Sequence, residues 1–287
     1  MGKGRPGAGA EVRVQPLSLK PPPDRLYGRA RGHKLRPRQQ LLLDVTLPRL
    51  AVGSFRVSPS PLEGEGRGEG CRGTGRGGEP PPPNLGPLRG PSHQGEGELL
   101  AEPLFPPTIT QLWIEVGFGG GEHALAQIAA HPEAGLIACE VFENGICSLL
   151  SRLVPDGEEA TGPLPPNLRL WPDDARVLLR GLPDASLDRL FLMFPDPWPK
   201  LRHAKRRFVH PAQLPLIARV LKPGAIWRVA SDDPTYQAWV TEVMAAQTLF
   251  DAPPPATTRP DDWPPTRYEA KALREGRSPR YWTFTRR

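Results

Sequence analysis

Apolar and polar positions alternate in blocks from about residue 107 onward, where short apolar runs take turns with segments of helical periodicity. Short apolar runs bounded by turn residues are typical of buried strands. Strands are predicted at 112–117, 135–140, 167–171, 186–194 and 225–231, and two late runs, 266–271 and 280–286, are predicted as closing strands. This alternation predicts an α/β protein whose parallel sheet carries helices on both faces.

Two segments precede this pattern near the N-terminus. Residues 1–24 are rich in Lys and Arg and lack periodicity, which predicts a basic, disordered tail. Residues 25–52 are predicted to form an N-terminal helical segment of the main domain, with a helix from about Arg38 to Leu47 whose apolar side chains lie on one face.

Residues 53–100 separate this segment from the alternating pattern. Twenty of the forty residues from 59 to 98 are Gly or Pro, and none is Val, Ile, Phe, Tyr or Trp. Such a sequence cannot bury enough apolar surface to offset the entropy of ordering it. We therefore expect a disordered insertion here and a single main domain over residues 101–287.

Composition narrows the range of functions. The net charge of +6 and the pI of about 9.5 favour an anionic partner, either nucleic acid or an acidic surface. Three cysteines without a C-x-x-C pair fit neither a disulfide framework nor a zinc site, so no metal and a reducing cytoplasm are expected. The sequence shows no signal peptide and no apolar run of about 18–20 residues that would span a membrane, and it implies no protein partner.

Acidic residues accompany a glycine-rich turn after the first predicted strand. Gly117 and Gly119 permit a tight turn at which a ligand contacts the backbone, which suits a dinucleotide, a nucleoside such as S-adenosylmethionine (SAM), or no ligand. Glu115 disfavours a pyrophosphate and suits a ligand ammonium. Glu140, at the end of the second strand, suits ribose hydroxyls, and the Asp173-Asp174 pair suits an adenine amino group. Together these acids favour SAM.

The stretch FPDPWPKLRHAKRRF, residues 194–208, follows the fourth predicted strand. Its first aspartate, Asp196, is expected at the ligand crevice, in a turn that the prolines restrict to few conformations. Trp198 is equally suited to stacking on a base and to covering the core. The five Lys/Arg residues from Lys200 to Arg207 favour phosphate contacts over a merely solvated surface.

At this point several motifs together resemble one family. FPDPWPKLRHAKRRF, IEVGFGGGEHAL (114–125), ASD (230–232), TRYE (266–269) and LYGRARGHKLRPRQQ near the N-terminus are similar to the signatures of bacterial tRNA (guanine-N7)-methyltransferases, the TrmB family. The resemblance implies a class I SAM-dependent methyltransferase (Rossmann-like) fold with a mostly parallel seven-stranded sheet. It also implies methylation of the variable-loop guanosine of tRNA, at position 46, on N7.

The resemblance assigns roles residue by residue. It implies SAM contacts for Glu115, Glu140, Asp174 and Asp196, with Asp196 as the active-site residue as well. Substrate binding is implied for Lys200, Asp232, Thr266, Arg267, Tyr268 and Glu269. Leu201 stands where a second lysine is common, the doublets Asp173-Asp174 and Asp232-Asp233 allow each assignment to slip by one, and the 53–100 insertion departs from the family pattern.

Guanine N7 carries a free lone pair, so its methylation needs no base to remove a proton. We therefore expect Asp196 to orient the guanine and to stabilise developing positive charge. Two alternatives remain from the sequence: a nicotinamide-dependent dehydrogenase on a similar sheet, and a catalytically silent tRNA-binding subunit. Glu115 before the glycines counts against the first, and the complete set of acids counts against the second.

Overall fold

The computed structural model describes residues 32–53 and 104–287 of the chain. The predicted tail over 1–24, and nearly all of the predicted insertion over 53–100, lie outside the described residues. No helix among the residues that are described is long and apolar enough to cross a membrane.

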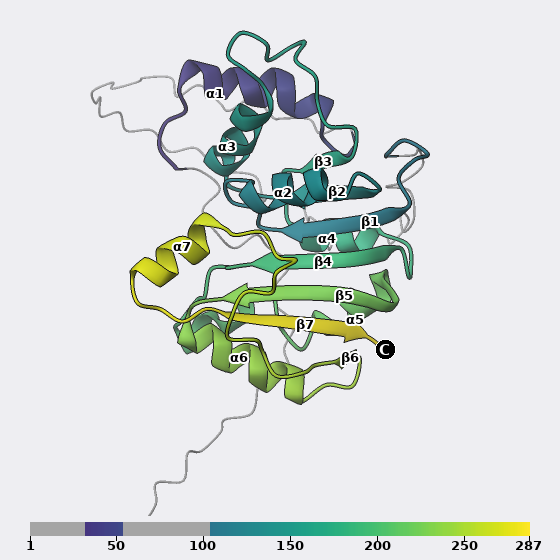
Figure 1. The fold of residues 1–287 in the computed structure, drawn as a ribbon, viewed down its shortest axis with the longest axis vertical. Helices are drawn as coiled ribbons and strands as arrows, with labels where there is room; N and C mark the ends of the chain where they lie inside the picture. The colour runs from purple at the N-terminus through teal and green to yellow at the C-terminus, as the bar shows by residue number, and fades with distance from the viewer. Residues whose placement is uncertain (1–31, 54–103) are drawn as a thin grey trace, which may run out of the picture.

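Seven strands form one sheet in the order β3-β2-β1-β4-β5-β7-β6 (Figure 1). Neighbours from β3 to β5 are parallel, and β7 is antiparallel to both β5 and β6. The predicted mostly parallel, seven-stranded α/β sheet is therefore confirmed. Its strands are β1 (Gln111–Val116), β2 (Ala134–Cys139), β3 (Leu168–Trp171), β4 (Leu187–Met193), β5 (Leu221–Ser231), β6 (Phe250–Asp251) and β7 (Arg280–Arg286).

Helices connect the strands and cover both faces of the sheet. Several begin where a side-chain oxygen accepts a hydrogen bond from the first turn, as when Asp174 accepts from Arg176 and Asp233 accepts from Tyr236. The helices of the main domain are α2 (Glu122–Ala130), α3 (Glu143–Leu153), α4 (Ala175–Gly181), the 3-10 helix η4 (Leu201–Arg206), α5 (Leu214–Val220), α6 (Pro234–Ala245) and α7 (Arg267–Arg274).

One predicted strand was wrong. The segment 266–271, predicted as a closing strand, forms the N-cap, Thr266, and the first turns of helix α7. The physical reason is a helix start within TRYE: the hydroxyl of Thr266 accepts the backbone N–H of Glu269 at 3.1 Å, a T-x-x-E arrangement typical of N-termini. Good helix formers then follow, in the sequence EAKALR.

The other predicted strands were confirmed, with bounds that shift by a few residues. The largest shift is in β5, which begins at Leu221 rather than near residue 225, and a register irregularity opposite Leu187 and Arg189 accommodates the extra residues. The two-residue strand β6 was not predicted, since a strand of this length carries no readable periodicity.

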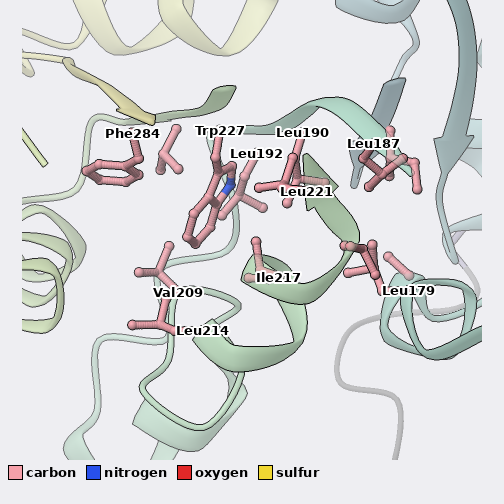
Figure 2. Packing of buried hydrophobic residues seen from close by; sticks show 14 of the residues in the cluster. Leu179, Leu187, Leu190, Leu192, Val209, Leu214, Ile217, Leu221, Trp227 and Phe284 are labelled. Atoms are coloured by element: carbon pink, nitrogen blue, oxygen red, sulfur yellow. The ribbon is translucent and has the colours of Figure 1, made fainter. Parts of the chain in front are cut away.

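Each face of the sheet has its own apolar core. One core lies between the sheet and α4, α5 and α6, and the other lies under α2, α3 and the N-terminal helices. Alternate residues of a strand point to opposite faces, so Leu190 of β4 enters the first core and Phe191 the second. Figure 2 shows Trp227 of β5 beside Leu192 of β4, on the side where α5 carries Ile217.

The N-terminal helix predicted from Arg38 to Leu47 was confirmed as a helical run of changing type. It comprises α1 (Pro37–Leu41), the π-helix η1 (Leu42–Thr46) and the 3-10 helix η2 (Leu47–Arg49). The chain then runs along β3: Leu170 donates to the carbonyl of Leu50 at 2.9 Å, and Val52 donates to the carbonyl of Leu170 at 3.0 Å. The segment therefore protects an edge strand that would otherwise present unpaired backbone groups.

The fold predicts a strong contrast between two leucines. Leu190 is fully buried and Leu201 is 76% exposed. Leu190→Ala should lower the free energy of unfolding by about 2–5 kcal/mol, because it removes buried apolar atoms and leaves a cavity. Leu201→Ala, the matched control, should change it by less than about 0.5 kcal/mol. Urea denaturation measures both, and equal losses would contradict the assigned core.

Candidate active site

A cavity of about 730 Å³ opens at the carboxyl ends of β1, β2 and β4, where ligands bind in parallel sheets. Figure 1 shows helix α7 near the carboxyl ends of these strands. The residues that matter below and that line the cavity are Gly117, Gly119, Glu140, Asp173, Asp174, Asp196, Trp198, Arg206, Arg207 and Tyr268.

The glycine turn between β1 and α2 forms one wall of this cavity. Gly117 and Gly119 have φ angles of +72° and +58°, a left-handed conformation that side chains rarely adopt. A Cβ on Gly119 would lie 2.8 Å from the hydroxyl of Tyr268. The turn therefore needs glycine at this position both for its backbone conformation and for the close approach of helix α7.

Glu140, directly after β2, faces the cavity from beside the glycine turn. One carboxylate oxygen accepts the backbone N–H of Gly119 at 2.8 Å, and the other accepts those of Val141 and Phe142 at 2.8 and 3.0 Å. Burial raises the pKa of the Glu140 carboxyl, the three backbone donors oppose this, and the charge of Asp196 raises the pKa further. The side chain is thus held in one orientation, and its pKa depends in part on the charge of Asp196.

The two aspartates after β3, Asp173 and Asp174, have different hydrogen-bond partners. The carboxylate of Asp174 accepts the backbone N–H of Arg176 at 2.9 Å and pairs with the guanidinium of the same arginine. Asp173 accepts the N–H of Asp174 at 2.6 Å. Both line the cavity. Asp174, which the family pattern favours, is therefore committed to starting α4, and Asp173 is the less engaged of the two carboxylates.

Glu115 lies behind the glycine turn and does not line the cavity. Its carboxylate is 1% exposed and lies 2.9 Å from Nδ1 of His123. The side-chain amide of Gln127 lies 3.1 Å from Nε2 of the same imidazole. Since an amide nitrogen only donates, Nε2 accepts and Nδ1–H donates to Glu115. The sequence predicts Glu115 as a contact for a ligand ammonium. It does not indicate the buried series of hydrogen bonds from Gln127 through His123 to Glu115.

Asp196 sits at the cavity in a strained loop. Phe194 and Trp198, on either side of it, have φ angles of +52° and +46°, which are uncommon for residues other than glycine. The Asp196 carboxylate is exposed, and no residue in the described part of the chain donates a hydrogen bond to it. A carboxylate with free acceptor sites is therefore presented to whatever occupies the cavity.

The basic run that follows is not one surface. Lys200, Arg202 and Lys205 are exposed. Arg206 lines the cavity and stacks over Trp198 at 4.7 Å. Arg207 is only 5% exposed, and burial lowers its pKa. The prediction that all five cations contact phosphates therefore fits Arg207 least, because its side chain is buried although it lines the cavity.

Two of the residues predicted to bind substrate are buried. Thr266 caps α7, and the carboxylate of Glu269 accepts the hydroxyl of Tyr281 at 2.6 Å and pairs with Arg259 at 3.1 Å. Burial raises the pKa of Tyr281, and the hydrogen bond to Glu269 and the charge of that carboxylate raise it further. Both residues thus hold α7 in place from beneath.

Of the remaining predicted substrate residues, Lys200, Arg267 and Tyr268 are exposed, and Asp232 is partly buried. Arg267 and Tyr268 are exposed on α7, with the guanidinium donating to the Tyr268 hydroxyl at 3.0 Å, and only Tyr268 lines the cavity. Lys200 is exposed outside the lining. Asp232 pairs with Arg277 at 3.1 Å, while its neighbour Asp233 caps α6. In the described ranges 32–53 and 104–287, no group of acidic, His or Cys side chains is arranged to hold a metal ion.

Comparison with known proteins gives a consistent picture. A family described as "Putative methyltransferase" matches residues 110–280. The chain is 56% identical to a tRNA (guanine-N(7)-)-methyltransferase of Granulibacter bethesdensis, over 94% of this chain and 99% of that protein. It is 45% identical to the protein of the same name from Rhodospirillum rubrum, over 92% and 88%. The solved 16S rRNA methyltransferase KamB is a looser match, with a TM-score of 0.44 and 15% identity over 62% and 89%.

The glycine turn allows a matched test. Gly119→Ala should lower the free energy of unfolding by about 1–2 kcal/mol for its positive φ, and further because the new methyl group meets Tyr268. Gly157→Ala is the control, because Gly157 has a φ of +88° with nothing within 4 Å. Urea denaturation should show the larger loss at Gly119, and Tyr268→Ala should reduce the difference. Equal losses at both glycines would show that α7 does not press on the turn.

Proposed function

The chain belongs to the family of tRNA (guanine-N(7)-)-methyltransferases, and we propose that it methylates N7 of the guanosine at position 46, in the variable loop of tRNA, using SAM. The observation that carries the proposal is identity of 56% over nearly the whole length of both chains. The cavity at the carboxyl edge of the sheet, with Glu140 and Asp196 in its lining, supports it from the side of the chemistry.

The cavity suits SAM in size and in the chemistry of its lining. About 730 Å³ is within the usual range of about 300–1,000 Å³ for small-molecule sites. Glu140 and Asp173 offer carboxylate oxygens to hydroxyl and amino groups, and the glycine turn lets a ligand approach the backbone. When bound, SAM supplies an electrophilic methyl group, which leaves its sulfonium sulfur as the bond to N7 forms.

Asp196 has the position and freedom that the reaction requires. The N7 lone pair is available without deprotonation, so the protein's main tasks are to orient the base and to accommodate the positive charge that arrives on it. The exposed carboxylate of Asp196 supplies a negative charge and free acceptor sites beside the cavity. We assign it to charge stabilisation and to orientation, with no proton transfer.

The exposed cations after the loop suit an RNA backbone. Lys200 directly precedes the short 3-10 helix η4, and Arg202 and Lys205 lie on it next to Arg206 of the cavity lining, where they can neutralise phosphates while the base is held inside. Because N7 lies on an edge that folded RNA hides, local opening of the tRNA is required, at a few kcal/mol. Phosphate contacts from these residues would offset that cost.

The two alternatives from the sequence fare differently. A family of methyltransferases does not accommodate a nicotinamide-dependent dehydrogenase, which is therefore set aside. A catalytically silent subunit is disfavoured because Asp196, Glu140 and the glycine turn are all present around one cavity. Activity measurements separate this alternative from the proposed enzyme.

The proposed function is tested by methyl transfer. Purified protein with SAM labelled in the methyl group should transfer label to unmodified tRNA, and chemical cleavage at 7-methylguanosine should map it to position 46. A tRNA transcript with adenosine at that position is the matched control and should remain unlabelled. Label at another base would overturn the substrate assignment, and absence of any label would favour the silent subunit.

Asp196→Asn tests the charge-stabilising role. It keeps the shape of the side chain and removes its charge, so kcat should fall by roughly 100-fold or more while the Kd for SAM changes less than about 3-fold. Single-turnover kinetics and calorimetry measure the two quantities. Asp156→Asn, an 84% exposed aspartate far along the chain, is the control and should leave both unchanged. An unchanged kcat in Asp196→Asn would rule out the role.

A further inference from the structure

Arg207 is the one buried cation of its run, and its neighbour Arg206 is partly buried against Trp198. Arg207 is 5% exposed, whereas Lys200, Arg202 and Lys205 are exposed to solvent. Its guanidinium carbon lies 4.7 Å from the centre of the Trp239 ring on α6. A buried guanidinium must find hydrogen-bond acceptors within the protein, because an unpaired buried charge is very costly.

The acceptors that Arg207 finds are backbone carbonyls of the catalytic loop. Its Nε donates to the carbonyl of Pro197 at 3.1 Å, and its Nη2 donates to the carbonyl of Trp198 at 3.1 Å. These two carbonyls directly follow Asp196 in the chain. The planar guanidinium thus grips two successive peptide groups, which a lysine ammonium cannot match in geometry.

The loop needs such a grip because its own backbone offers little. Prolines at 195, 197 and 199 remove three N–H donors, and Trp198 adopts an unfavourable φ of +46°. At its start the loop is fixed by the N–H of Phe194, which donates to the carbonyl of Ala230 at 2.8 Å. Asp196 therefore lies between one anchor on β5 and a second anchor, Arg207.

The second anchor is itself tied to a rigid element. The indole N–H of Trp239 donates to the carbonyl of Val209 at 2.5 Å, which fixes the chain two residues beyond Arg207. The hydroxyl of Tyr236, also on α6, accepts the N–H of Val209 at 3.5 Å. The position of the loop is thus set by α6, on the face of the sheet opposite to the glycine turn.

We propose that Arg207 is a positioning residue for Asp196 and not a phosphate ligand: it holds the Pro197 and Trp198 carbonyls and so fixes where the Asp196 carboxylate points. As a statement about catalysis this rests on the proposed function, since the reaction gives Asp196 its task. As a statement about the loop it stands alone and can be tested without substrate.

Two substitutions test this. Arg207→Lys keeps the positive charge but cannot donate to both carbonyls in the geometry of a guanidinium. Arg207→Met keeps an apolar side chain against Trp239 and removes both donors. We expect kcat to fall about 10-fold or more in Arg207→Lys and further in Arg207→Met. The KM for tRNA should stay within about 3-fold, and the slope of log KM against log salt should be unchanged.

Arg202→Gln is the matched contrast from the same basic run. It should raise the KM for tRNA and reduce the salt slope by about one. If Arg207→Met behaves in this way instead, with kcat retained in both Arg207 variants, Arg207 is a phosphate ligand and the proposal is overturned. The opposite split, in kcat and not in KM, supports it.

Amide hydrogen exchange provides a readout that needs neither SAM nor tRNA. Exchange of the segment from residue 194 to 206 should accelerate at least several-fold in both Arg207 variants and stay at the wild-type rate in Arg202→Gln, with thermal midpoints recorded to check folding. Unchanged exchange in folded Arg207 variants would overturn the proposal whatever the enzyme methylates. Failure of the wild-type protein to methylate tRNA would instead overturn the proposed function alone.

Discussion

The geometry of the site depends on the loop that carries Asp196, whose conformation is not stabilised by hydrogen bonds within its own backbone. Between β4 and η4 the chain carries prolines at 195, 197 and 199, and it places Phe194 and Trp198 at positive φ. A segment with so few backbone donors and with strained torsions persists only where its surroundings determine it. Those surroundings are β5 on one side and Arg207 with α6 on the other, so the geometry of Asp196 depends on these two elements.

The acids around the sheet edge look alike in sequence and separate by their partners in space. Glu115 lies within hydrogen-bond distance of His123, and Asp174 caps the start of α4. Glu269 accepts a hydrogen bond from Tyr281 and pairs with Arg259. Glu140 is held by backbone donors yet still faces the cavity, and Asp196 faces it with no such restraint. Glu115 and Glu269 thus have structural partners outside the lining, whereas Glu140, Asp173 and Asp196 present carboxylates to the cavity.

Most of the sheet could be predicted because buried parallel strands are continuous apolar runs that lie between helical patterns. Helix α7 was mistaken for a strand because its start depends on the capping role of Thr266, which outweighs a short apolar pattern. The nearness of Glu140 and Asp196 to one cavity follows from strands that share a carboxyl edge. The different fates of Arg202 and Arg207 could not be predicted, because they depend on contact with Trp239, more than thirty residues further on.

The energies of the loop are of comparable size on both sides. Two non-glycine residues at positive φ cost about 1–3 kcal/mol each, or roughly 2–6 kcal/mol together. Two hydrogen bonds from a charged guanidinium contribute about 1.5–3 kcal/mol each, or roughly 3–6 kcal/mol. The hydrogen bonds of Arg207 are therefore of the same order as the strain, and they act together with the bond from Phe194 to Ala230 on β5. In the proposed reaction, a carboxylate held in this way would meet the developing charge without reorganising, which is the condition under which electrostatic stabilisation is most effective.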